Sequence, residues 1–239
     1  GGITLFTKSM PGFEATYKEL PQARLIERTE TVGSFTMLDL TGAAKVELIE
    51  GPTTSVRLSG PEQVMNDVSV TTTDGALQFV YAEDTTSCII FCPGQKGLTA
   101  TITAPYINTI KASDAVRINA EKLSTPELII ELSDVSRVVT TVSSSKLTMT
   151  LGDASRLEVS GKSGMLEAKL NDVSRLEASE LQTNTSTISV SDASRVYVSV
   201  SQLLNTTGRD VGRIYYAGTP VIEKNMRDDA RVILLEEVE

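Results

Sequence analysis

The sequence contains no histidine and no tryptophan, and only two of its 239 residues are cysteines. Without histidine the chain lacks the usual general base, the usual imidazole metal ligand and the triads that depend on them. Two cysteines alone do not make a zinc site. These absences argue against a catalytic function, and we expect no cofactor.

Basic residues are outnumbered as well, with 22 Lys and Arg against 31 Asp and Glu and a formal net charge of −9. An acidic chain is a poor partner for nucleic acid or an anionic membrane surface. No apolar run approaches the roughly 20 residues of a transmembrane helix. The chain begins with Gly-Gly, and we expect any export signal to have been removed before this start.

The two cysteines, Cys88 and Cys92, lie in the segment Ser-Cys-Ile-Ile-Phe-Cys-Pro. In an extended strand they would be about 13 Å apart, whereas the Cα atoms of a disulfide lie within about 7 Å. A bridge therefore needs a turn between them. Two unbridged residues on one strand face are the simpler interpretation, and both remain open.

A four-residue pattern, Asp-x-x-Arg followed by a short apolar run, recurs through the second half of the chain. Six copies begin at Asp114, Asp134, Asp153, Asp172, Asp192 and Asp210 and end at Arg117, Arg137, Arg156, Arg175, Arg195 and Arg213, and a weaker seventh copy runs from Asp228 to Arg231. Successive Asp residues are 20, 19, 19, 20, 18 and 18 residues apart. A repeat this short is typical of one supersecondary unit stacked on the next.

Apolar and polar residues alternate on both sides of each copy, which predicts strands with one buried face. A coil of about 19 residues has a perimeter of about 60 Å. We therefore predict an all-β fold, a single-stranded right-handed parallel β-helix with two or three sides. Leu157, Leu176, Val196 and Ile214 should stack in one inward column, and the Ala or Val after each Asp should also point inward. A β-propeller is the main rival, but the repeats provide only about three of the four blades that it needs.

The Asp and Arg columns are interpreted as a structural ladder on an outer edge. Stacked Asp residues alone would place like charges about 5 Å apart. We expect each Asp to pair with an Arg of its own or the next coil, and to accept backbone N–H groups at the corner.

Residues 1–29 differ from the rest and are predicted to form a lead-in or an N-terminal cap, with the solenoid spanning residues 30–239. Gly42 and Lys45 look like a degenerate corner, and the 72 residues from Gly42 to Asp114 would accommodate four coils of 18. Asp74-Gly75 is a tight-turn signal that predicts a hairpin.

In the order of its segments the chain resembles the head-GIN-domain family of auto-transporter adhesins of Bacteroidetes. The resemblance covers roughly residues 30 to 222, through Gly33–Phe35, Ala43–Leu48, Val56–Glu62, Asp74–Leu77, Thr101–Pro105, the small-residue corners and Ile214–Pro220. Corners in that family commonly read Gly-Ser-Gly-Asp before an apolar residue, so the Arg is a departure. The resemblance implies a β-helix and export to the periplasm, outer membrane or cell surface, and it supplies no catalytic residues.

Two functions follow from these observations. The first is a non-catalytic, exported envelope protein, an adhesin-like scaffold or binding module whose partner is a surface glycan or an envelope protein. The alternative is a polysaccharide lyase or hydrolase, which needs two carboxylates about 5–10 Å apart. Glu83 and Asp84 come nearest to such a pair in the diverged part, but adjacent strand residues point to opposite faces. Calcium binding along the Asp column is disfavoured by the neighbouring Arg column.

Overall fold

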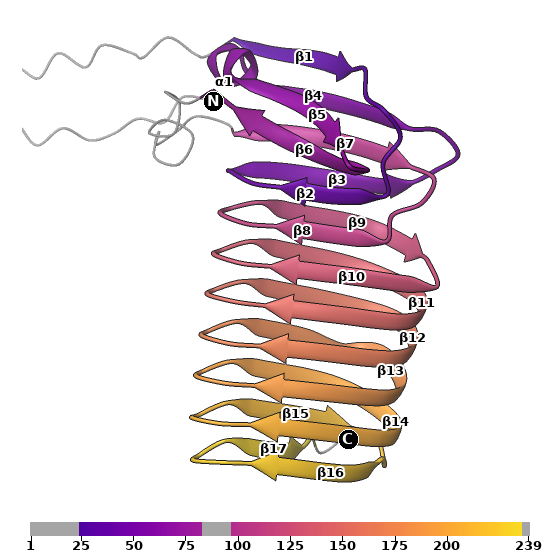
Figure 1. Ribbon diagram of the computed structural model, residues 1–239, viewed down its shortest axis with the longest axis vertical. Coiled ribbons are helices and arrows are strands. Elements are labelled where there is room, and N and C mark those ends of the chain that lie inside the picture. Colours follow the sequence, from indigo (N-terminus) through magenta and orange to yellow (C-terminus); the bar gives the residue numbers. More distant parts are fainter. Residues whose placement is uncertain (1–23, 83–96, 236–239) are drawn as a thin grey trace, which may run out of the picture.

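The computed structural model describes residues 24–82 and 97–235, and this part of the chain is almost entirely β-structure. Parallel coils about 19 residues apart stack into a β-solenoid of about seven turns (Figure 1). The predicted all-β solenoid is confirmed. None of the described residues belongs to a helix that is long and apolar enough to cross a membrane.

Each regular coil has two sides because its long strand bends in the middle. In β11 (Arg137–Leu151), residues 137–143 pair in parallel with β9 (Arg117–Ser124), while residues 146–151 pair with β10 (Glu127–Leu132). The strands β12 (Arg156–Leu170), β13 (Arg175–Val190) and β14 (Arg195–Gly208) repeat this path. The stack therefore has a first layer that starts at the Arg of each corner and a second layer that ends before the next Asp.

The order of strands in each layer follows from the pairing. The first layer runs through β1 (Leu25–Glu30), β4 (Ser55–Pro61), β7 (Leu98–Ala104), β3 (Ala44–Glu50), β9, the first halves of β11 to β14, β15 (Arg213–Ala217) and β17 (Arg231–Leu234). The second layer runs through β5 (Val68–Thr73), β6 (Ala76–Tyr81), β2 (Met37–Leu40), β8 (Thr109–Ala112), β10, the second halves of β11 to β14 and β16 (Val221–Met226).

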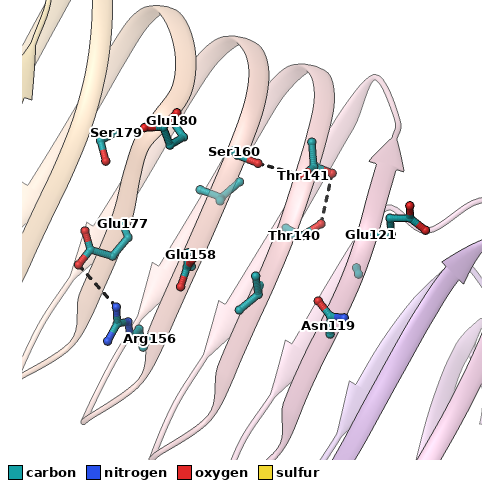
Figure 2. A pocket seen from close by; sticks show the side chains of 13 residues that line it. Asn119, Glu121, Thr140, Thr141, Arg156, Glu158, Ser160, Glu177, Ser179 and Glu180 are labelled. Atoms are coloured by element: carbon teal, nitrogen blue, oxygen red, sulfur yellow. Dashed lines mark hydrogen bonds and ion pairs between the residues drawn. The ribbon is translucent and has the colours of Figure 1, made fainter.

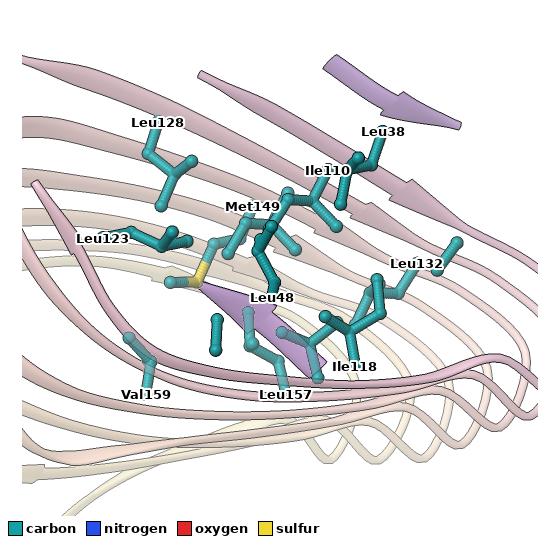
Figure 3. Close-up of a cluster of buried hydrophobic side chains, with 14 of the residues drawn as sticks. Leu38, Leu48, Ile110, Ile118, Leu123, Leu128, Leu132, Met149, Leu157 and Val159 are labelled. Atoms are coloured by element: carbon teal, nitrogen blue, oxygen red, sulfur yellow. The ribbon is translucent and has the colours of Figure 1, made fainter. Parts of the chain in front are cut away.

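The core lies between the two layers. Leu157, Leu176, Val196 and Ile214 are register partners in successive coils and are fully buried, so the predicted inward column is confirmed. Figure 3 shows Leu157 in the cluster with Met149, which comes from the second layer. Burying one such side chain contributes about 1.5–3 kcal/mol, and the column repeats this gain in every coil.

The prediction that the Ala or Val after each Asp points inward is wrong. Val135 and Val173 are 60% and 63% exposed, and the next residue, Ser136 or Ser174, is 1% exposed instead. The Ser174 hydroxyl donates to the carbonyl oxygen of Asn171 at 2.7 Å. The cause is the Asp itself, which has a left-handed backbone and so interrupts the alternation of the strand.

Gly42 does stand at a degenerate corner, since Lys45 is the register partner of Arg117. The prediction of four coils between Gly42 and Asp114 is wrong, however. Strands β2 and β3 stack directly on β8 and β9. The described residues between them form β4, α1 (Glu62–Asp67), β5, β6 and β7, and of these β6 and β7 pair in parallel with the edges of β2 and β3 that face away from β8 and β9.

Antiparallel pairing distinguishes this N-terminal end from the regular coils. The predicted hairpin at Asp74-Gly75 is confirmed, because β5 and β6 pair antiparallel and both turn residues have positive φ. Strand β1 pairs antiparallel with β4, and the Arg28 guanidinium donates to the carbonyl oxygens of Met65 and Val68, each at 2.8 Å.

The division into 1–29 and 30–239 remains a prediction, although β1 extends across it. Cys88, Cys92, Glu83 and Asp84 lie outside the described residues, as do residues 1–23.

Candidate functional site

Every Asp of the repeat occupies a left-handed corner, with φ between 57° and 59° from Asp114 to Asp228. One carboxylate oxygen of each Asp accepts a hydrogen bond from the backbone N–H of the corresponding residue one coil earlier. The bonds run from Gly42 to Asp114 and onward through Asp134, Asp153, Asp172, Asp192 and Asp210 to Asp228, at 3.0–3.3 Å. The Asp column is thus a ladder that binds neighbouring corners through side chain and backbone.

Asp192 shows how the column tolerates its stacked charges. The Ser191 hydroxyl donates to Asp192 Oδ2 at 2.8 Å, and the N–H of Asp172 donates to the same oxygen. These two hydrogen bonds, the hydroxyl first, hold the pKa of Asp192 below its usual value. Hydrogen bonding to the charged form therefore offsets the repulsion between carboxylates.

The Arg column does not pair with the Asp column, so that prediction is wrong. Within the described residues no ion pair joins Asp134, Asp153, Asp172 or Asp192 to an Arg. Arg137 pairs instead with Glu158 at 3.2 Å, and Arg156 with Glu177 at 3.8 Å. The reason is geometric: Glu lies two residues after an Arg on the same strand face, whereas the Asp carboxylate is directed along the stack toward the neighbouring corner.

Two tyrosines replace the acidic residues of this column in the last coils. The rings of Tyr197 and Tyr215 stack with centroids 4.6 Å apart and planes 8° from parallel, and the Arg175 guanidinium lies 5.0 Å from the Tyr197 centroid. One face of the Tyr197 ring meets the guanidinium and the other meets Tyr215. The row is therefore a structural ladder rather than an open stacking surface.

The regular stacking of the first layer is interrupted between β9 and β11, between β12 and β13 and between β13 and β14, and the first two interruptions are single-residue bulges. The coil that starts at Asp114 has an extra residue between Ala120 and Leu123, and the coil that starts at Asp172 has one between Ala178 and Leu181. The two coils between them are shorter. The extra residue of a bulge is left unpaired and the bulged strand bends, and the two shorter coils form the floor of a hollow between the two bulges.

The hollow has a volume of about 360 Å³ and is lined by four coils. Its floor consists of short side chains, and the hydroxyls of Thr141 and Ser160 share a hydrogen bond of 2.9 Å. Its full lining is Asn119, Ala120, Glu121, Val139, Thr140, Thr141, Arg156, Glu158, Val159, Ser160, Glu177, Ser179 and Glu180. Figure 2 shows Glu121 and Glu180 on opposite sides of this floor.

The acidic side chains of the hollow differ in whether an arginine neutralises their charge. Glu158 and Glu177 are engaged by Arg137 and Arg156, and Glu177 also accepts from Arg175. Glu121 and Glu180 are exposed and make no hydrogen bond or ion pair within the described residues. The hollow can therefore accept hydrogen bonds from hydroxyl or ammonium groups at its two rims.

Metal binding has no candidate here. Across residues 24–82 and 97–235, no group of three His, Cys, Asp or Glu residues is placed to hold a metal ion.

The hollow was not predicted from the sequence, in which the coils look uniform and the only candidate carboxylate pair was Glu83 and Asp84. The signal was present in the spacing: two steps of 20 residues enclose two steps of 19. Each extra residue is one of the bulges.

A comparison with family models identifies the chain. Residues 34–220 match the family described as "Putative auto-transporter adhesin, head GIN domain". The chain belongs to this family. The family resemblance predicted from the sequence is confirmed, and the hollow lies inside the region that matches the head GIN domain.

Solved structures agree with the head GIN fold. A crystal structure described as a putative adhesin from Bacteroides fragilis is 21% identical, with a TM-score of 0.80 over 90% of this chain and 97% of that one. One described as a putative lipid binding protein from Parabacteroides distasonis is 11% identical, with a TM-score of 0.72 over 90% and 98%. A putative adhesin from Parabacteroides merdae is 13% identical, with a TM-score of 0.70 over the same shares. No curated protein matches the chain.

Proposed function

We propose that the protein is a non-catalytic, exported module of the cell envelope that binds its ligand in the hollow of the first layer. The observation that carries the proposal is the pair of bulges, because they flank two shorter coils and leave a depression there that is lined by hydroxyl, carboxylate and guanidinium groups. Membership of the head GIN family supports an adhesin-like binding function.

The scaffold suits binding because it holds the lining residues in place. All four lining coils are joined by parallel ladders, and the Asp column connects their corners. A preorganised site loses little conformational entropy when a ligand binds.

The polar groups of the lining favour a glycan over a lipid. The interior of the solenoid is filled by apolar side chains that are 0–2% exposed in the neighbouring coils, such as Leu157 and Leu176. An acyl chain would need an apolar cavity, whereas the hollow offers hydroxyls, carboxylates and a guanidinium.

The arrangement also favours binding over catalysis. The two central carboxylates, those of Glu158 and Glu177, are engaged by guanidinium groups, as expected for side chains that position a ligand. An acid and base pair for glycoside cleavage would instead need one carboxyl in an environment that keeps it protonated.

A glycan array probed with the purified protein tests the binding function. Ser160→Trp should fill the floor of the hollow and abolish binding, whereas Thr187→Trp, an exposed position of the second layer on β13, should bind like wild type. Binding that survives Ser160→Trp would refute the proposed site. Incubating the protein with each bound polysaccharide should release no shorter products.

Fractionation of the source cells tests the location. An antibody against the protein should detect it in the envelope or on the surface of intact cells. Detection only in the cytoplasmic fraction would refute the proposed export.

A further inference from the structure

The hollow has negative charge at its two rims that nothing in the described chain neutralises. Glu121 stands in the first bulge and Glu180 in the second, and both are exposed. Lys122, the other residue of the first bulge, is exposed and does not line the hollow. The central acids are already paired with arginines, so the uncompensated charge belongs to the rims.

Between the rims the hollow has an unsatisfied donor. Arg156 Nε is buried and has no hydrogen-bond partner among the described residues, although the other end of its guanidinium reaches Glu177. A buried donor without an acceptor is unfavourable by about 1–3 kcal/mol. The side chain as a whole is 42% exposed, so a small rotation of the guanidinium would let a ligand oxygen accept from it.

We propose that the hollow binds an oligosaccharide that carries free amino groups, which lies across the coils with its ammonium groups on Glu121 and Glu180. This inference rests on the proposed binding function and specifies its ligand class. The rims are three coils apart, or about 14 Å at the spacing of adjacent strands. Hydrogen bonds between ammonium and carboxylate are about twice as strong as neutral ones. The hydroxyl and ring oxygens of such a ligand would face Arg156 and the Thr141–Ser160 floor.

A cationic peptide could meet the same two carboxylates, but the site suits it less well. Extended peptides are usually recognised through main-chain hydrogen bonds at the edge of a sheet. This hollow lies on a sheet face, whose backbone groups already pair between coils. Recognition here depends on side-chain hydroxyls, carboxylates and a guanidinium, which suits a polyhydroxylated ligand.

Calorimetric titration at low ionic strength tests the proposal with three probes: a β-1,4-linked glucosamine tetrasaccharide, its fully N-acetylated counterpart and a lysine tetrapeptide. The glucosamine probe should bind wild type, and the Glu121→Gln/Glu180→Gln double variant should bind it at least about tenfold more weakly. Glu127→Gln is the matched control, because Glu127 is an exposed glutamate of the second layer without a side-chain partner. It should bind like wild type.

The outcomes separate the ligand class from the site. The proposed ligand class would be overturned if the N-acetylated probe bound as tightly as the glucosamine probe, or if the lysine peptide bound more tightly. It would also be overturned if the glucosamine probe did not bind, or if the double variant bound it like wild type. If a different glycan on the array were lost in Ser160→Trp, the proposed function would stand while this inference failed. If no glycan on the array depended on Ser160, both would fail.

Discussion

The backbone N–H of Gly42 donates a hydrogen bond to Oδ2 of Asp114 at 3.0 Å, across 72 residues of sequence. The coil of β2 and β3 therefore stacks directly on the coil that starts at Asp114, and the described residues between the two coils form an insertion whose strands β6 and β7 stack on the other side of β2 and β3. The same glycine is covered by Tyr81 from that insertion, since a Cβ at position 42 would lie 2.8 Å from the tyrosine ring. One glycine thus joins the regular stack to its N-terminal end.

The Asp column should matter more to stability than the Arg column. Asp172→Ala removes the acceptor for the Asp153 N–H and places a Cβ-bearing residue without a compensating side chain at φ 59°. We expect a loss of about 2 kcal/mol in the free energy of unfolding from urea denaturation. Asp172→Asn should lose less than about 1 kcal/mol, because Asn tolerates this conformation and keeps an acceptor oxygen.

Arg156→Ala should lose only about 1 kcal/mol in the same measurement, because its ion pair with Glu177 is partly exposed. A larger loss for Arg156→Ala than for Asp172→Ala would contradict the backbone ladder and favour the ion-pair interpretation.

Gly161 should be hard to replace. Its φ is 103°, and an added Cβ would lie 2.2 Å from the Val142 carbonyl oxygen. Gly75→Ala is the matched control, because Gly75 also has a positive φ but has open space around its Cα. Gly75→Ala should lose about 1–2 kcal/mol in thermal or urea unfolding, and Gly161→Ala distinctly more. Equal losses would mean that the close approach of the two coils has no energetic effect.

Tyr81 should ionise at a higher pH than an exposed tyrosine. Burial, and secondly the charge of Asp114, raise the pKa of Tyr81 to about 12. The unfolded chain ionises this phenol near pH 10, so its contribution to stability is complete below pH 10 and is lost as the pH rises toward 12. Ultraviolet titration of the six tyrosines should show a late step that Tyr81→Phe removes. A titration of Tyr81→Phe identical to that of wild type would refute the assignment.

Asp192 should make the solenoid sensitive to acid. Its pKa is lowered by the Ser191 hydroxyl first and the Asp172 N–H second. A lowered pKa contributes stability above the unfolded value of about 3.9, and this contribution is lost as the pH falls through the folded value. The carboxyl carbon of Asp192, followed by NMR, should titrate below the usual range in wild type and closer to it in Ser191→Ala. An unchanged titration in Ser191→Ala would show that the hydroxyl bond is not the main cause.

The regular part of the fold could be predicted from local pattern because each coil repeats the same alternation. Leu157, Leu176, Val196 and Ile214 point inward wherever their strands pair, since strand residues two apart share a face. The turn at Asp74-Gly75 could also be predicted from the sequence, because its residues prefer the backbone conformation that a tight hairpin needs.

The sequence by itself thus determined the repeat length, the inward columns, the corners and the family. Only the tertiary structure decided which residues became neighbours: Gly42 next to Asp114, Arg137 next to Glu158, and Glu121 and Glu180 across one hollow. The periodic pattern depends only on residues that are close along the chain, so it can be recognised without knowing which coils contact each other. Pairing between coils depends on where an insertion leaves and rejoins the stack, on the left-handed backbone of each Asp, and on single-residue bulges that shift the register.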